Sequence, residues 1–70
     1  MGDFGARFKE CRVSAGFNQT QAAEAVGVHQ TAISMYERDK REPTADVVIK
    51  MALAYHVSID YLLGVSDVRG

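Results

Sequence analysis

The chain has 70 residues, of which 47% are hydrophobic and 24% charged, with a formal net charge of −1. A chain of this length buries roughly 60% of its unfolded surface, so we expect one small core with little stability to spare. No apolar run approaches the ~20 residues that span a membrane, Cys11 has no partner for an internal disulfide, and no signal segment opens the chain. We therefore expect a soluble domain in the reducing cytoplasm, without a membrane partner.

A first helix is predicted to run to about Ala15, with Asp3 as its N-cap and Gly16 as the residue that ends it. The apolar residues at helical spacing on its inward face are Phe4, Phe8, Cys11 and Ala15. Gly5 is expected to weaken the first turn, because glycine loses more backbone entropy in a helix than other residues do. The inward position of Cys11 predicts an inert thiol in the core.

Residues 19–38 are predicted to form two short helices joined by a glycine turn. Gly27 stands where the first of them must end in a left-handed conformation, which costs a residue with a Cβ about 1–2 kcal/mol. Ala23 is small where the two helices approach each other most closely. The apolar residues that lock the unit together are Ala22, Val26, Val28, Ile33 and Tyr36. A unit of this kind positions its second helix in the major groove of DNA.

Polar residues mark where these and later helices begin. Asn18 followed by Gln21 is a capping-box pattern at the start of the first of these two helices, the first motif helix. His29 falls at the N-cap of the second one, the second motif helix. Pro43 is predicted to break the chain, and Thr44 to begin a fourth helix directly after it. The inward stripe of that helix consists of Val48, Met51, Ala52 and Tyr55.

Ser58 is predicted to cap a short fifth helix that ends at Gly64. The chain shows no strand pattern, internal repeat or low-complexity segment. The predicted fold class is therefore all-α, with one compact five-helix domain over residues 1–64 that contains a helix-turn-helix. Residues 65–70 are expected to form a short flexible tail.

The residues that have been predicted to cap, turn or pack the helices form part of a longer pattern that runs from Phe4 to Gly64. The residues of this pattern are Arg12, Gly16, Asn18-Gln19, Ala23, Gly27-Val28, Ile33-Ser34, Tyr36-Glu37, Pro43, Lys50, Ala52, Val57-Ser58, Asp60 and Leu62-Leu63-Gly64. In this order the chain resembles the phage repressor and Cro-type helix-turn-helix domains, the XRE-like family. The resemblance implies a lambda-repressor-like fold and a bacterial or phage transcription regulator. The chain departs from the family in having Arg38-Asp39 where Asn-Gly is frequent, and His56 where glycine is frequent.

Base recognition is expected from side chains on the exposed face of the second motif helix. The predicted base-contacting residues are Gln30, Thr31, Ser34 and Met35. Gln30 is the strongest candidate, because an amide donates to and accepts from adenine at N7 and N6. Thr31 and Met35 offer methyl groups to thymine, so we expect A·T pairs in the half-site.

Phosphate contacts are expected from Gln19, as the family resemblance implies, and from a group of residues around the second motif helix, namely His29, Arg38, Lys40 and Arg41. The alternative for the three cations is an ordinary solvated charge run, since Asp39 and Glu42 are interleaved with them. The formal charge of −1 also lacks the basic excess that is typical of nucleic-acid binders. The resemblance further implies a partly buried structural ion pair between Arg12 and Glu37.

The function predicted is that of a transcriptional regulator, namely a repressor, which binds double-stranded DNA sequence-specifically as a homodimer on a palindromic operator. Ile59, Tyr61 and Leu53 are the predicted dimer interface, and at least one of Ile59 and Tyr61 should face outward; alternatively, both complete the core. An antitoxin-like or protein-interaction module with the same fold is the alternative function. His29 and His56 lack the spacing of a metal site, and we expect no enzyme activity, metal, cofactor or small-molecule substrate.

Overall fold

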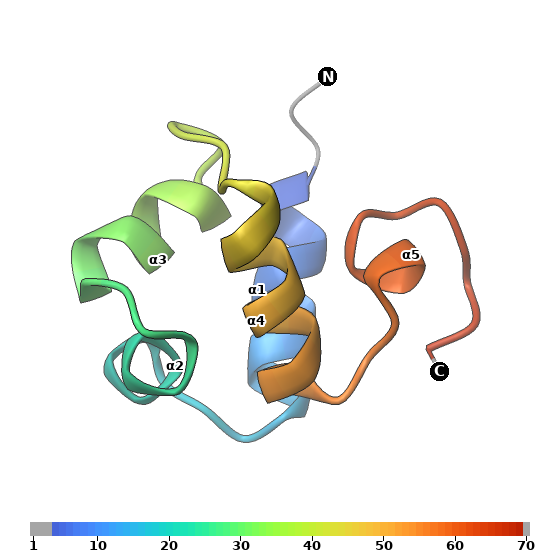
Figure 1. Cartoon of the computed structure of the whole chain (residues 1–70), viewed down its shortest axis with the longest axis horizontal. Coiled ribbons are helices and arrows are strands. Elements are labelled where there is room, and N and C mark those ends of the chain that lie inside the picture. Colours follow the sequence, from blue (N-terminus) through green and yellow to red (C-terminus); the bar gives the residue numbers. More distant parts are fainter. Residues whose placement is uncertain (1–3, 70) are drawn as a thin grey trace.

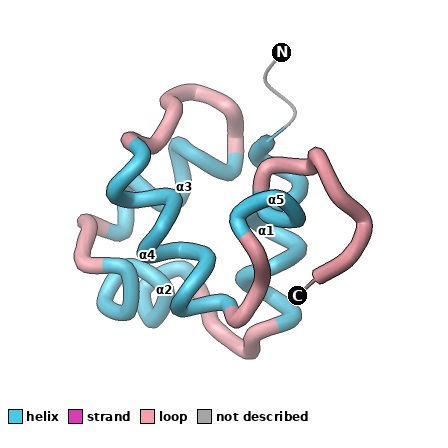
Figure 2. The backbone as a smooth tube through the Cα atoms, turned by 45° about the vertical axis from the view of Figure 1, so that its right-hand side comes forward, coloured by secondary structure: helices cyan, strands magenta, loops and turns pink. Residues whose placement is uncertain are grey.

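The computed structural model describes residues 4–69, which form five helices and no strand. The helices are α1 (Phe4–Ser14), α2 (Gln19–Val26), α3 (Gln30–Glu37), α4 (Ala45–Tyr55) and α5 (Ile59–Leu62). α1 and α4 pack together at the centre, with α2 and α3 on one side and α5 on the other (Figure 1). Short loops join the helices, and a longer irregular segment follows α5 (Figure 2). The all-α, five-helix fold predicted from the sequence is confirmed.

Side chains cap the helices where the sequence indicated. The Asn18 side chain accepts from the Gln21 backbone N–H at 2.7 Å, and the Gln21 side chain accepts from the Asn18 N–H at 2.9 Å, which completes the capping box. The hydroxyls of Thr44 and Ser58 accept from backbone N–H groups in the first turns of α4 and α5. Asp3, the expected cap of α1, lies outside the described residues.

Left-handed residues end two of the helices and shape one loop. Gly27 ends α2 with φ 85°, as predicted, and its N–H donates to the Ala23 carbonyl at 2.8 Å. Asp39 (φ 57°) and His56 (φ 59°) adopt the same conformation without being glycine. These are the two places where the chain departs from the family pattern. A left-handed residue with a Cβ carries about 1–2 kcal/mol of backbone strain, so each of these two positions has a cost that glycine would avoid.

The inward faces of the helices form one core. Its largest fully buried side chains are Phe8, Cys11, Val26, Ile33, Met51 and Leu62. The predicted inward face of α1 is confirmed at Phe8 and Cys11, whereas Phe4 is 37% exposed, because it lies in the first turn beside an open groove. Burial raises the pKa of the Cys11 thiol. A protonated thiol is a poor nucleophile, which agrees with the inert core role predicted for this cysteine.

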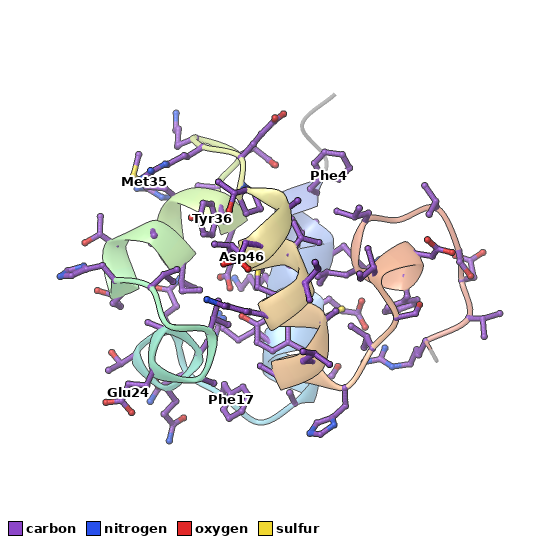
Figure 3. The ribbon with its side chains drawn as sticks, in the orientation of Figure 1. Phe4, Phe17, Glu24, Met35, Tyr36 and Asp46 are labelled. Atoms are coloured by element: carbon purple, nitrogen blue, oxygen red, sulfur yellow. The ribbon has the colours of Figure 1, made fainter. Side chains whose placement is uncertain are left out.

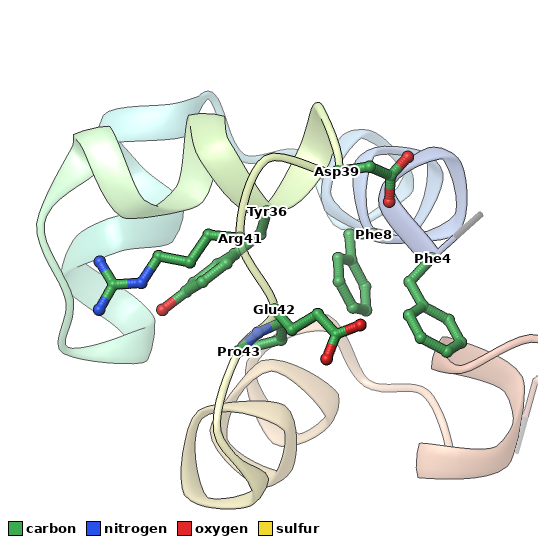
Figure 4. Close-up of a pocket in the computed structure, with 7 residues that line it drawn as sticks. All are labelled: Phe4, Phe8, Tyr36, Asp39, Arg41, Glu42 and Pro43. Carbon is green, nitrogen blue, oxygen red and sulfur yellow. The ribbon is translucent and has the colours of Figure 1, made fainter. Parts of the chain in front are cut away.

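Gly5 permits a close helix contact that the sequence did not reveal. A Cβ at this position would lie 2.9 Å from the Tyr36 carbonyl oxygen and 2.8 Å from the Glu37 carbonyl carbon. Asp39 completes the contact, since its Oδ1 accepts from the Gly5 N–H at 2.9 Å. Figure 4 shows the Asp39 carboxylate directed toward the start of α1, at the edge of a small pocket that Phe8 also lines. The first turn of α1 thus abuts the last turn of α3.

We expect Gly5→Ala to lower the free energy of unfolding by about 1–3 kcal/mol, because the new methyl group overpacks against α3. Helix propensity alone favours the opposite sign, since alanine is better than glycine in a helix by about 1 kcal/mol. Urea unfolding followed by circular dichroism measures the difference. Ala6→Gly, at the exposed neighbouring position, calibrates the propensity effect. A Gly5→Ala variant as stable as the parent would contradict the contact.

Residues 65–69 lie against α1 and α5. The Ser58 N–H donates to the Arg69 carbonyl oxygen at 2.6 Å, and Arg69 Nη1 donates to the Glu10 carboxylate at 2.8 Å. Arg7 Nη1 donates to the Ser66 carbonyl oxygen at 3.4 Å. The division into a domain over residues 1–64 and a flexible tail over residues 65–70 stays a prediction, and these contacts are the ones that a mobile tail would have to break.

Candidate nucleic-acid interface

α3 lies at one edge of the molecule, on the far side from α5 (Figure 1). Its inner face buries Ile33 and Tyr36. The residues predicted to contact bases are exposed or half-buried, and they are Gln30, Thr31, Ser34 and Met35. Figure 3 shows Met35 directed away from the molecule and Tyr36 directed inward. Because positions i, i+1, i+4 and i+5 share one side of a helix, these four side chains form a single surface.

A buried ion pair joins α1 to α3. Arg12 Nε donates to Glu37 Oε2 at 2.6 Å and Arg12 Nη2 donates to Oε1 at 3.1 Å, while Nη1 donates to the Phe17 carbonyl oxygen at 2.8 Å. Only 9% of the Arg12 side chain and 4% of the Glu37 side chain are exposed. These are the partners that the family resemblance implied. The two parallel N–H···O bonds hold the last turn of α3 in a fixed place.

Two glutamines extend this ion pair to the surface. Gln19 Nε2 donates to Glu37 Oε1 at 3.2 Å, and Gln30 Nε2 donates to Gln19 Oε1 at 2.9 Å. Gln19 begins α2 and Gln30 begins α3, so the contact joins the first turns of the two motif helices. The structure therefore links a predicted phosphate-contacting residue directly to the predicted base reader.

His29 is the N-cap of α3, as predicted. Its Nδ1 accepts from the Thr31 N–H at 3.2 Å. A neutral imidazole that accepts at Nδ1 carries its hydrogen on Nε2. The exposed His29 ring can therefore donate from Nε2 to a phosphate while it caps the helix.

The three predicted phosphate-binding cations are exposed in and before the loop between α3 and α4; they are Arg38, Lys40 and Arg41. Among residues 4–69, no acidic side chain lies within ion-pair distance of any of the three. The interleaved Asp39 is engaged with the Gly5 N–H instead. This arrangement leaves all three cations available to phosphates.

Several acidic residues behind the net charge of −1 lie away from the outer face of α3 or are already paired. Glu37 is neutralised by Arg12. Glu10 pairs with Arg69 at 2.8 Å and accepts a hydrogen bond from Tyr61 of α5. α3 itself carries no other acidic residue. The net charge of the chain therefore does not describe the charge of this surface.

An apolar groove of about 400 Å³ lies between α4, α5 and the first turn of α1, and its lining residues are Phe4, Pro43, Ala45, Val48, Ile49, Ile59 and Leu63. Ile59 is 40% exposed and Ile49 is 47% exposed. Leu53 lies one turn after Ile49 on α4 and is 71% exposed. At least one of Ile59 and Tyr61 was expected to face outward, and Ile59 does so.

Tyr61, assigned from the sequence to a dimer interface, is only 9% exposed. Its hydroxyl lies 3.0 Å from both carboxylate oxygens of Glu10, and the guanidinium groups of Arg7 and Arg69 lie 4.1 and 4.8 Å from its ring centroid. These contacts use both the ring and the hydroxyl within the chain. Tyr61 therefore completes the core and is not exposed for a contact with a second copy.

Sequence reasoning missed the contacts between residues far apart in the chain. Gly5 and Asp39 are 34 positions apart, and Glu10 and Arg69 are 59 positions apart. One signal was available, because an unexplained glycine in a helix often marks a close packing contact. In the described part of the chain, no three His, Cys, Asp or Glu side chains are grouped to hold a metal ion. Within the same part, every helix is too short or too polar to cross a membrane.

Comparisons with known proteins agree with this geometry. Residues 8–62 match the family described as "Helix-turn-helix". The HTH-type transcriptional regulator ImmR of Bacillus subtilis (strain 168) is 45% identical over 64 residues, which are 91% of this chain and 50% of that protein. This chain thus spans about half the length of that relative.

Solved structures share the fold. The P22 c2 repressor, crystallised with a synthetic operator, superposes with a TM-score of 0.83 at 32% identity, over 90% of this chain and 96% of that one. The N-terminal DNA-binding domain of SinR from Bacillus subtilis gives 0.82 at 28% identity, over 90% and 93% of the two chains. ImmR and the P22 c2 protein are named as a transcriptional regulator and a repressor, which are not enzyme classes. The family model and these similarities show that this chain belongs to the phage repressor and Cro-type, or XRE-like, helix-turn-helix family.

Proposed function

We propose that this chain is a sequence-specific DNA-binding transcriptional regulator, acting as a repressor, and that it places α3 in the major groove of a palindromic operator as a homodimer. The hydrogen-bonded pair of Gln19 and Gln30 at the outer end of α3 carries the proposal, because it presents an oriented amide to a base edge. The operator complex of the similarly folded P22 c2 repressor supports it. Selection of bound sites from random duplex DNA is the test. An enriched palindrome supports the proposal, and the absence of enrichment contradicts it.

Base and phosphate contacts divide between two groups of residues. Gln30 reads adenine, Thr31 and Met35 contact thymine methyl groups, and Ser34 bonds to an adjacent base edge. The phosphate group lies at the two helix starts and in the following loop, and it consists of Gln19, His29, Arg38, Lys40 and Arg41. The positive end of the α2 dipole strengthens the contact at Gln19.

Gln30→Ala should relax the preference at one base pair of the half-site, while Lys40→Ala should weaken binding to all sequences alike. The reason is that Gln30 bonds to a base edge and Lys40 bonds only to phosphate. Affinities for the selected operator, for single-pair variants of it and for random duplex DNA measure the two effects. Equal losses on cognate and random DNA for Gln30→Ala would refute the base-reading assignment.

The apolar groove is the proposed surface for the second copy. A symmetric dimer needs one self-complementary patch. Phe4, Ile49 and Ile59 are exposed apolar side chains that line the groove, and Leu53 lies one turn beyond Ile49 on α4, so a second copy can pack against them. The lining of the groove includes Pro43, which follows the loop that carries Lys40 and Arg41, but no residue of α3. Dimerisation at the groove therefore leaves α3 free. We expect this interface to bury less than the ~1,200 Å² of stable complexes. We therefore expect a weak dimer in solution that tightens on a palindrome.

Ile59→Asp should leave the helical circular-dichroism signal and half-site binding intact, and should abolish cooperative binding to the full palindrome. Leu53→Asp, at a more exposed position, is expected to act in the same direction. Val13→Asp introduces the same charge at a 58% exposed position outside the groove and serves as the matched control. Cooperative binding by both Ile59→Asp and Leu53→Asp would place the dimer contact elsewhere.

The same groove, together with the net charge of −1, favours a second candidate function, an antitoxin-like or protein-interaction module. In that case a partner protein occupies the groove and DNA selection enriches no site. The two candidates thus differ in one measurement.

A further inference from the structure

The loop after α3 begins with a turn that Asp39 makes in the left-handed conformation, at φ 57°. The Asp39 N–H donates to the Tyr36 carbonyl oxygen at 3.2 Å, and the Lys40 N–H donates to the Met35 carbonyl oxygen at 2.9 Å. These two bonds are those of a Schellman motif, in which the left-handed residue is most often glycine. The backbone of Asp39 thus ends α3 and directs the chain into the loop that carries Lys40.

The side chain of Asp39 reaches a different helix. Its Oδ1 accepts from the Gly5 N–H at 2.9 Å, in the first turn of α1 (Figure 4). The first four N–H groups of a helix have no partner within the helix, and a carboxylate there also interacts favourably with the positive end of the helix dipole. Asp39 therefore caps an N–H of α1 from 34 positions away in the chain. The glycine that is frequent at this position in the family has no side chain for such a contact.

This double attachment has two consequences for a loop that binds phosphates. Lys40 follows Asp39 directly, is exposed, and forms no ion pair among residues 4–69. Because Asp39 is bonded to α3 through its backbone and to α1 through its side chain, the backbone from which Lys40 extends is fixed to both helices. The bond to Gly5 also occupies the acidic group that is nearest to Lys40 in the sequence.

We propose that Asp39 is a positioning residue for DNA binding, which holds Lys40 where it contacts a phosphate by anchoring the loop to the N-terminus of α1. This inference rests on the proposed function. Asp39 itself touches no phosphate, because a carboxylate and a phosphate repel each other. Its effect on affinity therefore has the opposite sign to the one that its charge alone predicts.

Asp39→Gly and Asp39→Asn separate anchoring from charge. Both remove the negative charge, and both glycine and asparagine tolerate the left-handed conformation. Only asparagine keeps an oxygen that can accept from the Gly5 N–H. Asp39→Gly should weaken binding to operator and random DNA alike by about threefold to tenfold, and should make the log–log salt slope less steep by about one to two. Asp39→Asn should keep the slope and bind at least as tightly as the unchanged protein.

Two further variants control for charge and for backbone freedom. Glu42→Gln removes the charge of another exposed acid in the same loop, and it should keep the slope without weakening binding. Asp39→Ala has a Cβ but no acceptor, so it should weaken binding as Asp39→Gly does. If only the glycine variant weakens binding, backbone freedom is the cause and the inference is wrong. Urea unfolding verifies that each variant is folded.

A double variant tests whether Asp39 acts through Lys40. If it does, Asp39→Gly should weaken binding by less than about twofold in a Lys40→Ala background, because the side chain that it positions is already absent. Losses of affinity that multiply fully in the double variant would overturn the inference.

Exchange of the Gly5 amide hydrogen, measured by NMR on the protein without DNA, tests the contact separately. Asp39→Gly should accelerate this exchange, and Asp39→Asn should not. Unchanged exchange in Asp39→Gly, or tighter DNA binding by that variant, contradicts the inference while DNA reading by α3 stands. If the unchanged protein enriches no site, the proposed function itself fails, and the inference fails with it.

Discussion

Glu37→Ala should lower the free energy of unfolding by about 3–5 kcal/mol, because the Arg12 guanidinium would stay buried without its carboxylate. The remaining partner of Arg12 would be the Phe17 carbonyl oxygen at 2.8 Å. A domain of this length has only about 4–10 kcal/mol of stability in total, so this loss removes a large share of it. Urea unfolding monitored by circular dichroism is the measurement.

Two comparisons keep this prediction specific to the buried pair. Glu24→Ala removes an exposed carboxylate of α2, one that Figure 3 shows at the molecular edge, and should change stability by less than about 0.5 kcal/mol. Replacing Arg12 by methionine together with Glu37 by leucine removes both charges and should recover much of the loss. A Glu37→Ala variant that loses no more than Glu24→Ala would show that the ion pair contributes little.

Operator affinity should fall about 250- to 1,000-fold between 50 and 200 mM salt, which corresponds to a log–log slope of about −4 to −5. The cationic phosphate contacts expected are Lys40 and Arg41, with Arg38 as a third, so a dimer neutralises about four to six phosphates. These cations have no acidic partner among residues 4–69, so no internal ion pair has to break when DNA binds. Binding titrations over this salt range measure the slope.

Lys40→Ala should make the slope less steep by about two in a dimer, because each copy then contacts one phosphate fewer. Lys9→Ala removes another exposed charge, from α1 and outside the predicted phosphate group, and should leave the slope unchanged. A slope near zero for the unchanged protein would favour the protein-interaction function, because counterion release accompanies any binding to phosphates.

The helix starts and turns could be predicted because the residues that create them are neighbours in the chain. Asn18 and Gln21 cap α2, and Gly27 ends it, through bonds that span three or four positions. The all-α fold followed from such local signals and from apolar residues at helical spacing. The candidate base readers were also accessible to this reasoning, since one face of α3 had to be buried and the other exposed.

The local signals failed on α5, where the sequence has two apolar side chains and either of them could face outward. Ile59 and Tyr61 lie two positions apart on α5, and the sequence could not decide which of them faces outward. The structure buries Tyr61, because Glu10, Arg7 and Arg69 surround its ring and hydroxyl. Arg69 and Arg7 come from opposite ends of the chain, so no spacing within α5 indicates this environment.

By itself the sequence determined the five helices, their caps, the glycine turn, the family and the face of α3 that carries Gln30, because each depends on residues within a few positions of one another or on a matching pattern. Only the tertiary structure decided that Gly5 must lack a side chain, that Tyr61 belongs to the core, and that Gln30 ends a hydrogen-bond chain from the buried Glu37. The physical reason is that these features depend on distances and donor directions between separate helices, which exist only once the helices have packed.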